Sequence, residues 1–474
     1  RMGKSTLMKE LNADYILKKL NEEDMLEILT EHYMASSFKG EARGLILGAA
    51  GIDLRFIGIW ARESAEKLDD TTLEFNRDIA LHHALNEIDL EKLDREVDFN
   101  GDHSFFDKNP DYSNICRAAS VQQLRDALKP GVDVNARDNR GKTPLMHVVY
   151  NPDFMKVLLE AGAEVNARDE DGKTALMHTV YAQKDNPTAA EMLVEAGADI
   201  DARDEDDRTA LMLAAEHNRT RTVKTLLHSG ANVNGQDKDG MTALMYAVSQ
   251  WNSWQGSSDP ELIDALLEAG ADVNEKSEDG MTALMFAAKD ISAVNRLLQN
   301  GADVNAKDED GMTVLMYATA HSSNYDIVSA LLCAGIDVNE RDRDGMTALM
   351  YAAWQDSPDP RVIDALLRFG SNINEKDASR KTALMYAAGD GQMSEVIYGL
   401  SRAGADVNAQ DKDGKTALMY AASDNIPEIV DALLDVGANT SVRNKLGKRA
   451  VNYARKNGKL TDSGALKRLE NASR

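Results

Sequence analysis

The feature that most constrains this chain is an internal repeat. Thr-Ala-Leu-Met, or its Thr-Pro-Leu-Met or Thr-Val-Leu-Met variant, occurs nine times about 34 residues apart, beginning at Thr143, Thr174, Thr209, Thr242, Thr282, Thr313, Thr347, Thr382 and Thr416. A second motif, Gly-Ala-Asp-Val-Asn or a close variant, recurs in phase with the first, from Gly131 to Gly404. Two motifs locked to one period indicate repeated structural units. A unit this short cannot bury its own apolar face, so the units must stack into an elongated array.

One unit, from Asp237 to Asn274, shows how each repeat is expected to fold. Gly240 lies in a polar turn and can take the positive φ that other residues resist. Thr242 precedes an apolar run, where its hydroxyl is placed to cap a short helix. A second helix with Leu266 on its apolar face should follow, and Gly270 should end it with a left-handed cap. The unit therefore reads as hairpin, helix, turn and helix.

This pattern closely resembles the ankyrin repeat, over residues 114 to about 458. The shared features are Asp-x-x-Gly-x-Thr-Pro/Ala-Leu, an Ala-rich first helix, a Leu-Leu second helix and Gly-Ala-Asp-Val-Asn. The resemblance implies an all-α solenoid in which short β-hairpin turns connect helix pairs. One departure is systematic, because Met replaces the usual His after the Leu at Met146, Met177, Met212, Met245, Met285, Met316, Met350, Met385 and Met419. We expect adaptable apolar packing to replace the hydrogen bonds attributed to that His.

The repeat pattern divides the chain into four parts. Residues 1–112 form a helical N-terminal region, either degenerate ankyrin repeats or a separate helical domain. Residues 113–138 are expected to form an N-terminal capping repeat, and residues 139–444 the array of about nine repeats. Residues 445–474 should form a basic C-terminal capping repeat and tail. Terminal units with polar outer faces are what a repeat array requires.

Charge and cysteine content limit the partners and the compartment. The formal net charge is −25, which disfavours binding to nucleic acid or to an anionic membrane and favours a protein partner with a basic or apolar surface. The exception is residues 441–474, with ten basic and two acidic residues, which could engage an acidic partner or another copy, or simply keep the cap soluble.

Two cysteines, Cys116 and Cys333, indicate a reducing compartment, so we expect a cytoplasmic protein. We see no signal peptide and no apolar stretch long enough to cross a bilayer.

Few residues point to chemistry, and we predict no catalytic, cofactor-binding or metal-binding residue and no small-molecule substrate. Gly3-Lys4-Ser5-Thr6 matches the end of a phosphate-binding P-loop, but the preceding strand and first glycine are absent. An alternative function is therefore the regulatory or sensor segment of a larger nucleotide-hydrolysing protein. The turns 169–172 and 308–311 resemble calcium loops only in part. His147 and His178 are expected to be structural or surface residues.

The residue after each hairpin glycine varies in an ordered way. It is basic in the first three and the last repeats, and it is Met in four central ones: Met241, Met281, Met312 and Met346. One interpretation is a ladder of side chains that shield one another. The other is an exposed apolar contact strip for a protein partner.

Aromatic side chains supply the remaining candidates. In the ankyrin family the hairpin tips and the end of the first helix usually form the partner groove on the concave face. The resemblance, together with the weight of aromatic anchors at interfaces, makes Tyr150, Tyr181, Trp251, Trp254 and Trp354 candidate contacts. Six further rings hold the usual Leu position of the first helix and are expected in the core: Tyr246, Phe286, Tyr317, Tyr351, Tyr386 and Tyr420. The sequence thus predicts a non-catalytic interaction scaffold.

Overall fold

The computed structural model describes residues 110–182, 185–249, 258–321, 324–355, 357–389, 393–424, 426–461 and 463–472. The chain divides into two compact units, Arg1–Pro110 and Asp111–Arg474, and the second contains nearly all the described residues. The expected N-terminal helical region, the Gly3–Thr6 motif, Trp251 and Trp254 lie outside the described residues.

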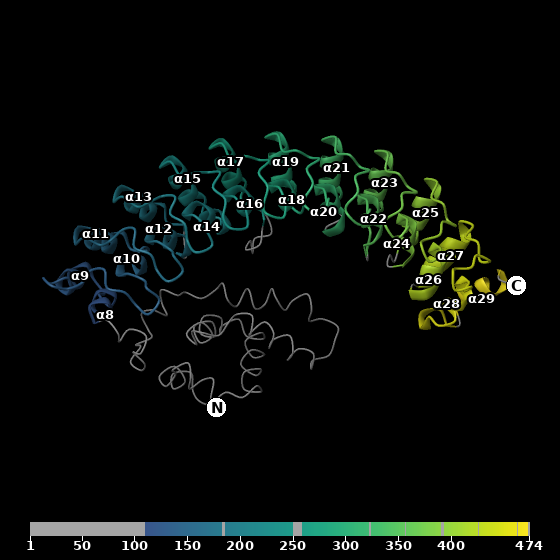
Figure 1. Ribbon diagram of the computed structural model, residues 1–474, viewed down its shortest axis with the longest axis horizontal. Coiled ribbons are helices and arrows are strands. Elements are labelled where there is room, and N and C mark those ends of the chain that lie inside the picture. The colour runs from purple at the N-terminus through teal and green to yellow at the C-terminus, as the bar shows by residue number, and fades with distance from the viewer. Residues whose placement is uncertain are drawn as a thin grey trace, which may run out of the picture. The chain divides into compact units, whose positions relative to one another are not determined.

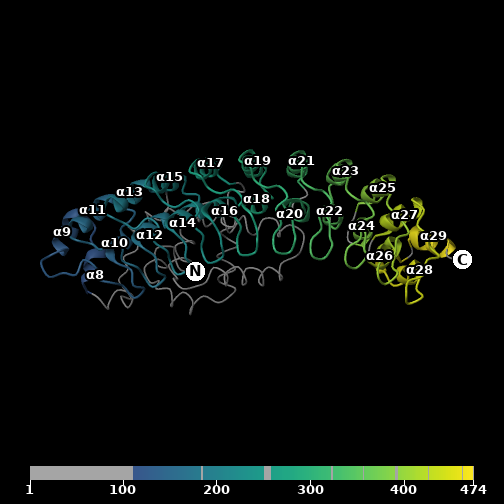
Figure 2. The same cartoon turned by 45° about the horizontal axis from the view of Figure 1, so that its top comes forward.

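Two rows of helices make up the described unit (Figures 1 and 2). The first-helix row comprises α8 (Pro110–Cys116), α10 (Pro144–His147), α12 (Ala175–His178), α14 (Ala210–Glu216), α16 (Ala243–Val248), α18 (Ala283–Phe286), α20 (Val314–His321), α22 (Ala348–Ala353), α24 (Ala383–Gly389), α26 (Ala417–Asp424) and α28 (Ala450–Ala454). The second-helix row comprises α9 (Val121–Ala127), α11 (Pro152–Glu160), α13 (Pro187–Glu195), α15 (Thr220–His228), α17 (Pro260–Glu268), α19 (Ile291–Gln299), α21 (Tyr325–Cys333), α23 (Pro360–Arg368), α25 (Ser394–Arg402), α27 (Pro427–Asp435) and α29 (Gly464–Ala472). Single 3-10 turns follow α12 at Thr179–Tyr181 and α28 at Gly458–Leu460.

The ends of the helices follow the residues that the repeat places there. The Thr242 hydroxyl accepts a hydrogen bond from the Met245 N–H and so caps α16, as predicted. Gly270 follows α17 with φ +88°, and Gly240 takes φ +71° in the hairpin, which also confirms the expectation. Second helices such as α17 begin with an acceptor side chain and a proline, here Asp259 and Pro260, because a first-turn proline loses no helical hydrogen bond.

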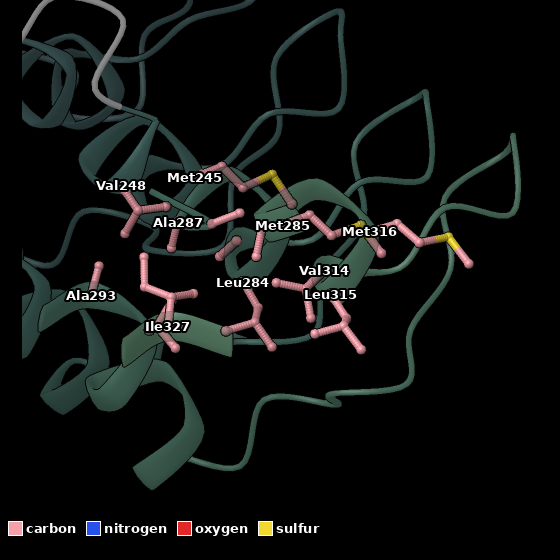
Figure 3. Packing of buried hydrophobic residues seen from close by; sticks show 14 of the residues in the cluster. Met245, Val248, Leu284, Met285, Ala287, Ala293, Val314, Leu315, Met316 and Ile327 are labelled. Carbon is pink, nitrogen blue, oxygen red and sulfur yellow. The ribbon is translucent and has the colours of Figure 1, made fainter. Parts of the chain in front are cut away.

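The core is continuous along the row of repeats. The nine methionines that replace His are each at most 4% exposed, and Met245, Met285 and Met316 lie beside Leu284 and Leu315 in successive layers (Figure 3). Their thioethers fill the space between neighbouring first helices, which is the adaptable packing expected of Met. The stability of each repeat therefore depends on its neighbours.

Asparagine side chains add polar links between repeats. The Asn234 side chain donates to the Gly270 carbonyl of the next repeat over 3.1 Å, and its Oδ1 accepts from the Asp272 N–H over 2.8 Å. Asn166, Asn274, Asn339 and Asn374 make the same pair of bonds with the repeats that follow them. This explains why the glycine-containing motif ends in Asn.

The hairpins are tight turns rather than paired strands. Across the residues that the structure describes, the β-pairing is the isolated bridge between Lys276 and Thr282. No helix in this part of the chain is long and apolar enough to cross a membrane.

Candidate partner-binding surface

Each hairpin is tied to the next by a backbone hydrogen bond. The Glu278 N–H donates to the Asp239 carbonyl over 2.8 Å, and the Glu309 N–H donates to the Asp279 carbonyl over 2.9 Å. Equivalent bonds run from the hairpin of Arg140 to that of Lys445. The hairpin tips are therefore a connected row, and a partner would meet a preformed surface.

An aspartate at the start of the hairpin organises both the turn and the first helix. Oδ1 of Asp237 accepts from the N–H groups of Asp239 and Met241, at 3.0 and 2.8 Å. Oδ2 of Asp237 accepts a 2.5 Å hydrogen bond from the hydroxyl of Tyr246 in α16. Burial and the neighbouring Asp237 carboxylate raise the pKa of Tyr246, so the phenol stays a donor. Four more repeats form this bond at 2.6 Å: Tyr317 to Asp308, Tyr351 to Asp342, Tyr386 to Asp377 and Tyr420 to Asp411.

In repeats without this tyrosine, either another residue replaces the hairpin aspartate or the aspartate bonds a different side chain. Phe286 has no hydroxyl, and Ser277 stands in its repeat where the others have the aspartate. His178 places Nε2 2.7 Å from Oδ2 of Asp169, which is the structural role expected for that histidine. In the last repeat the pair is reversed, because the Asn444 side chain donates to the Tyr453 hydroxyl over 2.7 Å. A spacing of nine residues links these pairs in the sequence.

The four methionines that follow hairpin glycines differ in burial. Met241 is 3% exposed and Met346 4%, while Met281 and Met312 are half-buried against the core. Met241 and Met346 belong to the core cluster, and Met281 and Met312 pack against it. This burial agrees with the interpretation as a ladder of mutually shielding side chains. The exposure that a contact strip requires is absent at Met241 and Met346, and partner contact at the four positions stays a prediction.

The predicted core rings are buried or half-buried. Tyr246 and Tyr386 are buried, and Phe286, Tyr317, Tyr351 and Tyr420 pack partly exposed against the core.

Three of the five aromatic candidates lie in the described part of the chain, and all three are exposed. Tyr150 is 69%, Tyr181 43% and Trp354 47% exposed, at the ends of the first helices of their repeats. Tyr181 meets the His217 ring edge-on at a centroid distance of 5.2 Å, and Trp354 lies 5.4 Å from Tyr386. We call the surface formed by the ends of the first helices the first-helix side. It carries these three exposed rings.

Each of the four central hairpins has an aspartate two residues before its methionine, and we call these four aspartates the acidic row. The side chains of Asp239, Asp279, Asp310 and Asp344 are exposed. Arg343 pairs with Asp310 over 2.9 Å, so part of this charge is balanced between neighbouring hairpins.

Comparison with known proteins explains this architecture. The family model described as ankyrin repeats (3 copies) matches residues 115–204, 180–277, 253–342, 289–377, 349–444 and 384–462. The chain belongs to the ankyrin repeat family. It is also similar to the crystal structure of the ankyrin repeat domain of Bcl-3, titled a unique member of the IkappaB protein family, with 30% sequence identity, 48% of this chain and 99% of that chain covered, and a TM-score of 0.41. No curated protein matches the chain.

Ankyrin repeats are general protein–protein interaction modules. Among the residues with a described position, no three His, Cys, Asp or Glu side chains gather in a group that could hold a metal ion. The buried carboxylates of the ankyrin hairpins, such as Asp169 and Asp237, are instead used by hydrogen bonds within their own repeats.

The sequence did not lead us to predict a binding role for a row of lysines in the last ankyrin repeats. The ammonium of Lys381 lies between the rings of Tyr386 and Tyr420, 5.0 and 4.9 Å from their centroids. Lys415 lies between Tyr420 and Tyr453, at 5.1 and 5.7 Å. The signal in the sequence was the fixed five-residue step from each lysine to a tyrosine.

Proposed function

We propose that this chain is a non-catalytic scaffold that binds a protein partner across the first-helix side of its ankyrin repeats. The observation that carries the proposal is the exposure of Tyr150, Tyr181 and Trp354 at the ends of first helices. Other rings of the first-helix row, such as Tyr246 and Tyr351, are hydrogen-bonded to hairpin aspartates. Large exposed aromatic side chains on a rigid support are typical anchors of protein interfaces.

The rigidity of the support favours binding. Backbone bonds between hairpins and the buried methionine layers hold the anchors in fixed positions, so little conformational entropy is lost when a partner docks. Because Tyr181 and Trp354 belong to repeats separated by several others, a partner that touches both must be extended or large. A stable complex would bury at least about 1,000 Å².

The terminal units are proposed to cap the array. In the last one, Arg468 on α29 pairs with Asp431 and Asp435 on α27, at 2.7 Å each, and presents a polar outer side. In the first, the Tyr112 hydroxyl on α8 donates to Asp138 over 3.2 Å. Such caps shield the apolar ends of a repeat array from water.

A reducing compartment such as the cytoplasm suits the two cysteines. Cys116 and Cys333 are both free thiols. Burial raises the pKa of the Cys116 thiol to about 12, which keeps it protonated and unreactive.

The test is partner capture with matched variants of the full chain. We expect wild-type protein to retain at least one specific partner from a lysate of the cells that make it, and Tyr150→Ala/Tyr181→Ala/Trp354→Ala to lose it. Phe369→Ala is the control, because Phe369 is 51% exposed at the end of a second helix, α23. Capture of the same proteins in the same amounts by a folded triple variant would overturn the proposal.

A further inference from the structure

The C-terminal repeats carry an alternating row of tyrosine rings and lysine ammonium groups. Lys381 and Lys415 each lie between two rings, and Lys448 lies over Tyr453 at 5.8 Å. We call Lys381, Lys415 and Lys448 the lysine ladder. Each of its members follows the hairpin turn of its repeat, at the position that holds a buried or half-buried Met in the central repeats.

The rings that support the ladder are held in place. The hydroxyls of Tyr386 and Tyr420 donate to buried Asp377 and Asp411, and the Tyr453 hydroxyl accepts from Asn444. A cation over an aromatic face is attracted by the negative potential of the ring. The lysine stems therefore lie against fixed rings, and the loss of side-chain entropy on binding an anion is reduced.

The ladder lysines carry unbalanced charge. Among the described residues, none of the three has a carboxylate oxygen within 4 Å of its Nζ. Two of the three N-terminal cations at the same hairpin position differ, because Lys173 pairs with Asp171 at 3.6 Å and Arg208 with Asp206 at 3.2 Å. An anion would thus find available positive charge in the last three hairpins.

The acidic row of the central hairpins is also interrupted there. Its position holds Ser379, Asp413 and Leu446 in the last three hairpins, so one acid remains. The exposed side chains of Arg380, Lys412 and Lys445 add further positive charge beside the ladder.

We propose that the lysine ladder binds an extended acidic segment of a protein partner. Stacked helices lie about 10 Å apart, which sets the spacing of the hairpins and of the ladder lysines. An extended polyproline II segment rises about 3.1 Å per residue, so its every third side chain matches this step. The segment that fits has Asp or Glu at every third position. Nucleic acid is disfavoured because the rest of a chain with net charge −25 repels a long phosphate backbone.

The probe is a synthetic twelve-residue peptide in which Glu, Pro and Ala repeat in order, titrated into the full chain at low salt. The comparison peptide has the same composition with its glutamates contiguous, and a single-stranded oligonucleotide of equal charge is the third probe. We expect the spaced peptide to bind about tenfold more tightly than the contiguous one, and the binding to weaken as salt is added.

Variants locate the site. Lys381→Met/Lys415→Met removes two ladder charges with a side chain that the central repeats accept at this position, and should weaken binding about tenfold. Lys142→Met/Lys173→Met makes the same change in the N-terminal hairpins and should alter binding by less than about twofold. Equal loss in both variants, no preference for the spaced peptide, or tighter binding of the oligonucleotide would each overturn the proposal. The capture variants leave all three ladder lysines in place, and the ladder variants leave Tyr150, Tyr181 and Trp354 in place, so the failure of one proposal can be told from the failure of the other.

Discussion

The Tyr246 hydroxyl donates a 2.5 Å hydrogen bond to Oδ2 of Asp237, nine residues earlier in the same repeat. This one contact joins the hairpin to the first helix and holds the Tyr246 ring in place. In the last repeats the equivalent pairs hold the tyrosine rings of the lysine ladder. The same type of residue pair therefore stabilises the core and supports a proposed binding surface.

Removing the hydroxyl should therefore destabilise the array. Tyr246→Phe leaves a buried carboxylate oxygen without its donor, and we expect a loss of about 1–2 kcal/mol in the free energy of unfolding. Asp237→Ser/Tyr246→Phe copies the natural Ser277 and Phe286 pair and should recover part of that loss. Denaturant unfolding of the single and double variants measures both. A single variant as stable as the wild type would show that the bond contributes nothing.

Hairpin glycines should differ in their tolerance of a side chain. Gly240 has φ +71°, and a Cβ there would lie 2.7 Å from the Glu278 backbone nitrogen. Gly447 has φ +73° with nothing within 4 Å of its Cβ position. We expect Gly447→Ala to cost about 1 kcal/mol for the backbone alone, and Gly240→Ala to cost at least about 2 kcal/mol. Thermal unfolding compares them, and equal costs would be inconsistent with close contact between hairpins.

The cost of replacing a methionine by alanine should follow how deeply that methionine is buried. Met177 is fully buried, so Met177→Ala should cost about 2–5 kcal/mol through lost burial and a cavity. Met312 is half-buried at the hairpin, and Met312→Ala should cost less than about 1.5 kcal/mol. Urea midpoints of the two variants give the order. The reverse order would mean that hairpin packing, not the inter-repeat layer, carries the stability.

His178 should make stability depend on pH. Burial lowers the pKa of His178 below its ordinary value of 6.5, against the opposing effect of Asp169. The unfolded chain therefore takes up this proton at higher pH than the folded one, so the stability contribution is present above about pH 6.5 and falls as pH drops toward the folded pKa. His178→Tyr copies the tyrosine of the later repeats and should lose less stability than the wild type between about pH 7.5 and pH 5.5. Unfolding midpoints at both pH values check this. Equal losses would remove His178 as the cause.

The repeat itself, its helix ends and its inter-repeat packing could be predicted from the sequence because they depend on local rules. Thr242 and Gly270 act within a few residues of themselves, and the nine methionines share one position in one period. The exposure of Met241 could not be judged in this way, because it depends on how the core packs in three dimensions around the hairpin. The Lys381 contacts with Tyr386 and Tyr420 were missed for the same reason, since one partner belongs to the next repeat.

Site-specific photocrosslinking tests most directly whether a protein partner binds the first-helix side of the repeats. A photoreactive amino acid would replace Tyr181, Trp354 or, as the control, Phe369, in the full chain within the cells that make it. We expect discrete crosslinked protein adducts at positions 181 and 354 and none at 369. Adducts at position 369 alone, or no adduct at either first-helix position in a folded protein, would contradict it.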